Sequence, residues 1–437
     1  MRRFLAILAA VLSLVAAPPT AQEAAADGSV TVTGAQARLI ARQALQEGKL
    51  RIAETVSVAL LERNPEDAEA LMIRALLRRG AGRLEEARSA AAAAWRHAEP
   101  PALRFDAAIL TADILTRQER FTRAQFWLRR ADQSATDEAR SAAAARAYAA
   151  VRRRNPLQLQ LRFSLKPSNN VNNGAETTEI EIGGLPFQLD DSGQQLGGWE
   201  SSAGLSFGYR LSENEAHRTD LLGEVFYRKV WLNSYAAVLA PGVSGSDFDY
   251  GTVIAGLRHQ RLIWPEIGPS SITGVIGQSW YGGEDFARWG EVQLGQTVAR
   301  GENSALRFGL QARVENRLDD PINDSHSIGG SADYLRRLDG GGTFSVGGHV
   351  RTVWSDSATV DSLVLGLRGS RSFGRIGPVE PRVTLTAQTR DYRKWSTTPG
   401  GRADHTLGLR LDLAWPDVSY YGFVPQASLN ARRTWSN

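Results

Sequence analysis

The sequence has no cysteine among its 437 residues. This absence excludes disulfides, thiolate nucleophiles, cysteine metal ligands and lipid attachment to a cysteine. Histidine is scarce, with six residues, and the chain contains no phosphate-binding loop, H-E-x-x-H helix or G-x-S-x-G elbow. We therefore expect a protein that is not an enzyme and that needs no cofactor or metal ion.

Long apolar runs are also missing beyond the N-terminal segment, although a membrane-spanning helix needs about 18 consecutive apolar residues. The first residues fit a secretory signal peptide, because two arginines precede an apolar run over 4–17 and small residues continue to Ala21. We expect cleavage after Ala21, which makes residues 1–21 the signal peptide. A formal net charge of +4 is too small to indicate a nucleic-acid partner.

Residues 22–156 are rich in alanine, leucine, arginine and glutamate, which favour helices. A short motif that ends at Ala53 recurs at Ala87 and at Ala124, with offsets of 34 and 37 residues. A second alanine precedes each of these by twelve residues: Ala41, Ala75 and Ala112. This spacing of small residues resembles the tetratricopeptide repeat, a helix-turn-helix unit.

Three such repeats and a capping helix over 137–154 would form an α-solenoid. Solenoids of this kind bind other proteins on their concave face. The alternative interpretation is a plain helical spacer. Arginines at 152–154 fit either a position at the inner surface of the membrane that the barrel spans or an ordinary solvated charge run.

After Pro156 the apolar period changes from 3.6 residues to 2. Every second residue from Leu157 to Leu165 is apolar, which predicts a strand with one apolar and one polar face. The same alternation predicts thirteen antiparallel strands over 157–437, beginning near residues 157, 197, 217, 247, 270, 286, 304, 326, 342, 360, 379, 403 and 420.

Three features favour a transmembrane β-barrel over a soluble sandwich. The alternating segments span roughly ten to fifteen residues, which is longer than strands of globular domains. Aromatic residues collect near their ends, as in interface girdles. The polar face carries many charges, which we expect to line a water-filled lumen: Arg162, Arg210, Arg307, Arg313, Glu315, Arg351, Arg368 and Arg410.

Thirteen is an unusual number of strands, because bacterial single-chain barrels have even numbers. We expect a barrel of fourteen-stranded type whose last strand is missing, since Asn437 also differs from the aromatic residue that normally ends such barrels. The alternative is an extra strand pair over 177–189. Its glycines and Pro186 favour a protruding hairpin instead.

The lengths of the connections predict the orientation of the barrel. If the helical domain is periplasmic, the first strand runs outward and the long connections 166–196, 232–245 and 393–402 face the outside. Acidic pairs at Glu284–Asp285 and Asp319–Asp320, and His326, also fall in outer connections. We expect these polar residues to be ordinary parts of loops and not a cation-binding site or a hydrolase active site.

A polar segment follows the first strand, with candidate signature residues Asn169, Asn170, Val171, Asn172 and Asn173. With the repeats, the change at Pro156 and the later stretch 184–191, it resembles the surface lipoprotein assembly modulator (Slam) family. Members join periplasmic tetratricopeptide repeats to a fourteen-stranded outer-membrane barrel. Asparagine also tolerates turn conformations, so the segment is equally consistent with a plain loop.

The resemblance implies a translocator that assists surface lipoproteins or secreted proteins across the outer membrane. The implied partners are a client lipoprotein or secreted protein, outer-membrane lipid, periplasmic chaperones and the barrel-assembly machinery. The alternatives are an exopolysaccharide exporter and a passive porin-like channel. The sequence thus predicts a two-domain α + β protein, with an N-terminal α-solenoid over 22–156 and an antiparallel barrel over 157–437.

Overall fold

The computed structural model describes residues 32–175, 179–182, 185–188, 193–264, 266–398, 400–418 and 423–436. The expected signal peptide and its cleavage site lie outside these residues. The chain divides into two compact units, Met1–Val151 and Arg152–Asn437. In the described part of the chain, no helix is long and apolar enough to cross a membrane.

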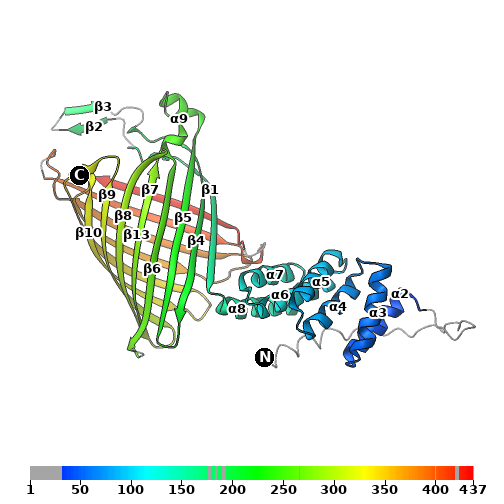
Figure 1. The fold of residues 1–437 in the computed structure, drawn as a ribbon. Coiled ribbons are helices and arrows are strands. Elements are labelled where there is room, and N and C mark those ends of the chain that lie inside the picture. The colour runs from blue at the N-terminus through cyan, green and yellow to red at the C-terminus, as the bar shows by residue number, and fades with distance from the viewer. Residues whose placement is uncertain are drawn as a thin grey trace, which may run out of the picture. The chain divides into compact units, whose positions relative to one another are not determined.

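The described part of the first unit is a row of antiparallel helix pairs (Figure 1). The pairs are α2 with α3, α4 with α5, and α6 with α7, and a last helix, α8, follows them. Consecutive helices pack on each other, and α2, α4 and α6 also contact in series. The bounds are α2 (Gly34–Gln46), α3 (Leu50–Arg63), α4 (Ala68–Gly80), α5 (Leu84–His97), α6 (Pro101–Arg117), α7 (Phe121–Gln133) and α8 (Glu138–Arg154).

The repeat alanines explain the close packing of these helices. All six are at most 2% exposed, because a small side chain lets two helix backbones approach: Ala41, Ala53, Ala75, Ala87, Ala112 and Ala124. The turns within the first two pairs contain Gly48 and Gly82 with φ of 72° and 75°. Glu119 occupies the same position in the third pair with φ 59°. The predicted solenoid of helical repeats is confirmed.

The second unit is built on one antiparallel sheet of thirteen strands, in which each strand pairs with the next strand of that sheet along the chain. The strands run over 11 to 17 residues. They are β1 (Leu157–Ser168), β4 (Gly198–Glu213), β5 (His217–Leu232), β6 (Tyr250–Trp264), β7 (Gly268–Tyr281), β8 (Glu284–Arg300), β9 (Ser304–Arg317), β10 (Ser325–Arg337), β11 (Thr343–Ser355), β12 (Ser362–Ser372), β13 (Glu380–Tyr392), β14 (Arg402–Ala414) and β15 (Gln426–Ser436).

The thirteen predicted strands are therefore confirmed, most of them beginning within two residues of the expected position. Two begin later than expected. Residues Gly245–Phe248 form a 3-10 helix, η2, so β6 begins at Tyr250. The last strand begins at Gln426, after Pro425, which has no N–H to donate to a ladder.

The two described strands between β1 and β4 do not enter the large sheet. Strands β2 (Glu179–Ile182) and β3 (Leu185–Gln188) pair only with each other and form a separate two-stranded sheet. The hairpin interpretation is correct, and the alternative of an extra strand pair in the barrel is wrong.

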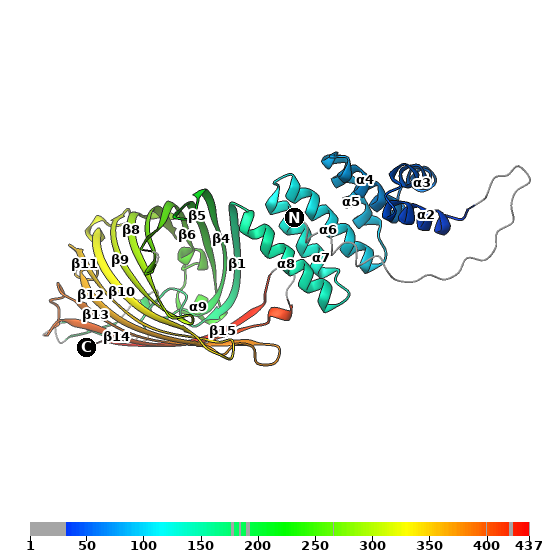
Figure 2. The same cartoon turned by 90° about the horizontal axis from the view of Figure 1, so that it is seen from below.

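The large sheet curls until its terminal strands approach each other (Figure 2). The ring of Phe163 on β1 lies 6.2 Å from that of Phe423, which precedes β15. Connections alternate between two rims of this barrel. We call the rim where β1 ends the loop rim, because it carries the connections 169–197 and 233–249, and the opposite rim the turn rim.

Candidate functional site

The pairing register gives the sheet one polar and one apolar face. Phe163 and Leu165 on the apolar face are each 68% exposed. The polar face begins with Arg162, which pairs with Gly204, and continues strand by strand through the register. All eight charged residues predicted to line a lumen lie on this polar face.

The eight residues do not converge on one pocket. Arg313 is the best connected, with its guanidinium 2.5 Å from Glu315 and 3.5 Å from Glu291 and its Cζ 4.1 Å from the ring centroid of Trp289. Arg162 lies 3.5 Å from Glu224.

Four of the other predicted residues lie elsewhere around the barrel. Arg210 pairs with Glu213 at 2.7 Å near the turn rim, and Arg410 pairs with Asp412 at 2.7 Å. Arg307 and Arg368 form no ion pair among the described residues. The arrangement is a charged lining spread around the barrel, with Arg351 on β11 as a further member.

The asparagine segment is a braced loop. Asn172 donates from Nδ2 to the carbonyl of Gln194 at 2.6 Å and accepts at Oδ1 from the N–H of Leu196 at 3.0 Å. Asn170 exchanges two hydrogen bonds with the backbone of Gly174. Val171 between them is 1% exposed.

The outer two asparagines of the segment contribute less to this brace. Asn169 and Asn173 are exposed, and Asn173 adopts a left-handed φ of 54°. The segment is therefore explained as an asparagine-rich turn that holds the side chain of Val171 in a buried position.

A second connection folds onto the polar face beside Val171. Residues 233–249, which we call the loop cap, contain the short helix α9 (Ser234–Leu239) and η2. A small apolar cluster holds the cap, with these buried members: Val171, Leu196, Val230, Ala236 and Ala240. Val230 belongs to β5 and pairs with Glu200, so it lies on the polar face.

The cap also identifies the polar face as the inner one. Figure 2 shows α9 within the ring of strands, and Figure 1 shows it at one end of the barrel. Because α9 packs against Val230 from inside that ring, the polar face lines the interior and the apolar face is outside.

Polar contacts fix the C-terminal end of the cap. The Nη2 of Arg228 donates to the carbonyl of Phe248 at 3.0 Å. The carboxylate of Asp249 accepts from Tyr227, from the Nζ of Lys229 at 2.7 Å and from the N–H of Val230 at 2.9 Å. These contacts secure the point where the cap returns into β6.

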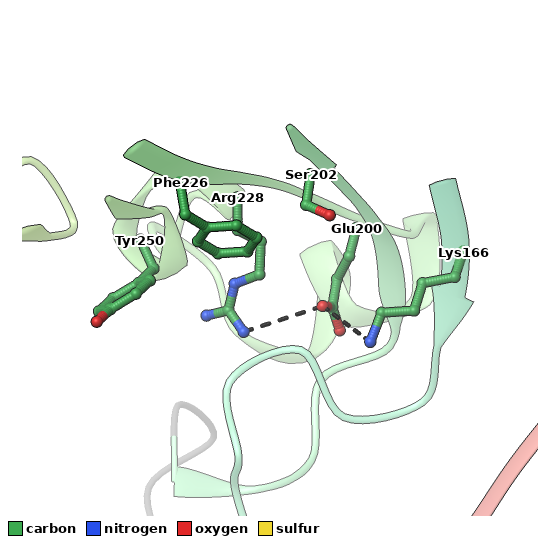
Figure 3. Close-up of a pocket in the computed structure, with 6 residues that line it drawn as sticks. All are labelled: Lys166, Glu200, Ser202, Phe226, Arg228 and Tyr250. Atoms are coloured by element: carbon green, nitrogen blue, oxygen red, sulfur yellow. Dashed lines mark ion pairs between the residues drawn. The ribbon is translucent and has the colours of Figure 1, made fainter. Parts of the chain in front are cut away.

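A cavity of about 260 Å³ lies on the same inner face (Figure 3). Two of its lining residues adjoin the end of the cap, because Arg228 donates to Phe248 and Tyr250 follows Asp249. Glu200 is the central charge, 6% exposed, with Lys166 Nζ at 3.2 Å and Arg228 Nη1 at 3.9 Å. The rest of the lining is Ser202, Phe226 and Tyr250. Sequence reasoning missed all six residues, because only the strand register brings them together.

The acidic pair Asp319–Asp320 at the loop rim has structural partners. Arg317 contacts Asp319 with two hydrogen bonds of 2.6 and 2.8 Å and holds the pKa of that carboxyl below its usual value. Asp320 caps the short helix η3 (Pro321–Asn323). The ring of His326 stacks on that of Trp354, with 5.3 Å between the ring centroids. Within the described ranges, no group of three metal-ligating side chains is assembled.

The helical unit carries a second polar surface, the α2–α4–α6 face. Arg38 pairs with Asp67 at 2.8 Å, and Arg79 pairs with Asp113 at 2.9 Å, so each repeat is tied to the next. Asp106 also belongs to α6 and accepts no hydrogen bond among the described residues. Burial raises its pKa to about 6, although the nearby Arg140 opposes this shift.

The fold and these surfaces define a two-domain α + β protein in which helical repeats precede an antiparallel β-barrel with a charged inner face. No protein-family model matches the sequence, and no curated protein matches it.

Solved structures resemble each unit separately. An outer-membrane channel from Pseudomonas putida F1 is 7% identical, with a TM-score of 0.34, and the match covers 64% of this chain and 96% of the channel. Acinetobacter baumannii OccAB3 is 10% identical, with a TM-score of 0.31, over 64% of this chain and 92% of that one. The TPR2B domain of yeast Sti1 is 18% identical, with a TM-score of 0.26, over 28% of this chain and 98% of that domain.

Proposed function

We propose that this chain is an outer-membrane translocator of the Slam type. In this proposal the barrel spans the outer membrane, the helical unit lies in the periplasm and recruits a client, and the charged inner face provides a hydrated route or wall. The client is a surface lipoprotein or a secreted protein, and the barrel-assembly machinery inserts the chain. The protein performs no catalysis.

The observation that carries the proposal is the division of the sheet into two faces. Strands of 11 to 17 residues are long enough to cross a bilayer at a tilt. Their outer face exposes leucine, valine and phenylalanine, while arginines and carboxylates alternate on the inner face. A soluble protein would bury this apolar face, whereas a lipid bilayer covers it.

Recruitment is the natural role of the helical unit. The α2–α4–α6 face presents charged groups of both signs, and α4 and α6 also carry the half-buried side chains Met72 and Ile109. Such a surface supports weak and reversible contacts, which suit a client that must leave as well as arrive. A passive channel would leave this unit without a role.

The test uses charge reversal of the full chain in a deletion strain. Arg42→Glu with Arg117→Glu changes two exposed side chains of the α2–α4–α6 face. Arg51→Glu with Arg63→Glu makes the same change on α3 and serves as the matched control, because both are exposed away from that face. Surface biotinylation then measures the set of exposed proteins, and immunoblots check that each variant reaches the outer membrane.

We expect the first pair to lower the surface exposure of at least one protein several-fold and the control pair to leave it unchanged. Equal effects of the two pairs, or none from either, would contradict recruitment by this face. A change in exopolysaccharide alone, or in small-solute uptake alone, would support one of the alternative functions.

A further inference from the structure

We propose that the loop cap, residues 233–249, is a displaceable plug that occupies part of the loop-rim mouth of the barrel and must swing away before the lumen beneath it opens to the outside. This inference rests on the proposed function, because a plug has a role only where something passes.

The first reason is the place of the cap. A loop of an outer-membrane barrel normally projects from the rim into solvent. This one packs on the inner face, where Ala236 and Ala240 of the cap are at most 2% exposed. Their shared cluster reaches the barrel wall at Val230, with Leu232 packed against it. The cap therefore occupies part of the mouth (Figure 2).

The second reason is that the wall offers the cap only a small apolar seat. Val230 lies between charged groups of the inner face, since its partner across the ladder is Glu200 and Arg228 is two residues away on the same strand. Val171 and Leu196, the other large members of the cluster, come from the neighbouring connection. When the cap leaves, the wall exposes mainly charged groups, which water solvates well.

The third reason is that the cap is held less strongly than the sheet. Each barrel strand shares a long hydrogen-bonded ladder with its neighbours, whereas one small apolar cluster and a few polar contacts hold the cap. Segments with little buried apolar area and few hydrogen bonds open at lower free energy than the core of a domain. Asp249 anchors the return into β6, so it is a natural pivot.

The cavity beside the cap shows what the plug would uncover. Ser202 lines that cavity with Glu200 and Arg228 (Figure 3). A probe attached at Ser202 would therefore report whether the space beside the cap is open to the outside.

The absence of cysteine makes this measurement direct. Ser202→Cys places one thiol beside the cap, and Val238→Cys places one on the outer side of α9, where Val238 is 78% exposed. Intact cells are treated with a polymer-linked maleimide too large to cross the outer membrane. We expect rapid labelling at position 238 and labelling about tenfold slower at position 202, as for a site reached through a minor open state.

The cap is then destabilised in the Ser202→Cys background. Ala236→Asp puts a charge into the apolar cluster, whereas Val238→Asp makes the same change on the exposed side of the same helix. We expect Ala236→Asp to raise labelling at position 202 to the rate at position 238, and Val238→Asp to leave it slow. A heat-modifiable band on gels shows that each barrel is folded.

Rapid labelling at position 202 with an intact cap would overturn the proposal, as would an Ala236→Asp barrel that folds and labels slowly. Absence of labelling at position 238 would place the loop rim away from the outside and overturn it too. If Ala236→Asp fails to assemble, replacement of residues 235–246 by Gly-Ser-Gly makes the same test. Labelling needs no client, so its outcome is separate from that of the surface-protein test.

Discussion

Arg79 on α4 and Asp113 on α6 form an ion pair of 2.9 Å that ties the second helix pair to the third. Asp113 also accepts from Arg117 at 3.1 Å, and the side chains of Arg79 and Asp113 are only 21% and 26% exposed. The pair therefore lies at the junction between repeats.

Asp113→Ala should lower the free energy of unfolding of the helical unit by about 0.5 to 1.5 kcal/mol, because it leaves Arg79 without its partner in a half-buried position. The measurement is urea unfolding of the whole chain in detergent, followed by far-ultraviolet circular dichroism. Glu85→Ala is the control. Its pairs with Arg88 and Arg120 are both solvent-exposed and should contribute little.

Asp106 should make the stability of the helical unit depend on pH. Burial raises its pKa from the ordinary 3.8 to about 6, so the folded unit binds a proton more tightly than the unfolded chain. The contribution of Asp106 to the stability of the unit is then most favourable below about pH 4, and it is lost as the pH rises through about 6. Asp106→Asn should stabilise the unit by about 1 to 2 kcal/mol at pH 7.5 and have little effect near pH 4. Unfolding curves at both pH values check this, and an equal effect at both would contradict it.

Glu119 is strained by its backbone, because a side chain at φ 59° costs about 1 to 2 kcal/mol. Glycine fills the equivalent position in the first two helix pairs, as Gly48 and Gly82. Glu119→Gly should stabilise the helical unit by about 0.5 to 1 kcal/mol, after the entropy cost of an added glycine. Gly82→Ala should destabilise it, and the opposite signs distinguish backbone strain from a lost side-chain contact.

Arg313 neutralises two carboxylates on the inner face of the barrel. Arg313→Met leaves Glu315 and Glu291 without that cation, and Glu291 is only 12% exposed. We expect a loss of about 1 to 3 kcal/mol in barrel stability, seen as a lower temperature for the heat-modified gel band. Arg307→Met, on the same strand and face, removes an exposed arginine and should shift the transition far less.

The sequence predicts the fold best where one spacing of apolar or small residues recurs many times. Alternation specified the barrel strands because a slip of one residue would turn every apolar side chain to the inner face. The alanines at twelve-residue spacing specified the helix pairs, because only small residues fit at those crossings. Both signals are local, and each is repeated several times along the chain.

The cap and the cavity could not be predicted in this way. The sequence indicates Val171 only as part of a candidate family signature, yet its burial depends on Leu196 and Ala236, which lie far away in the sequence. In the sequence, Glu200 and Arg228 are simply two more polar positions on two strands. The ion pairs that Glu200 forms with Lys166 and Arg228 depend on the register of three strands. Contacts among short segments from separate connections leave no periodic signal.

The most direct test of the account compares surface-exposed proteins between a strain that lacks this chain and the same strain complemented with it. The translocator proposal predicts that at least one lipoprotein or secreted protein disappears from the cell surface in the deletion strain, remains inside the cell and returns on complementation. A complete surface set in the deletion strain would contradict the proposal.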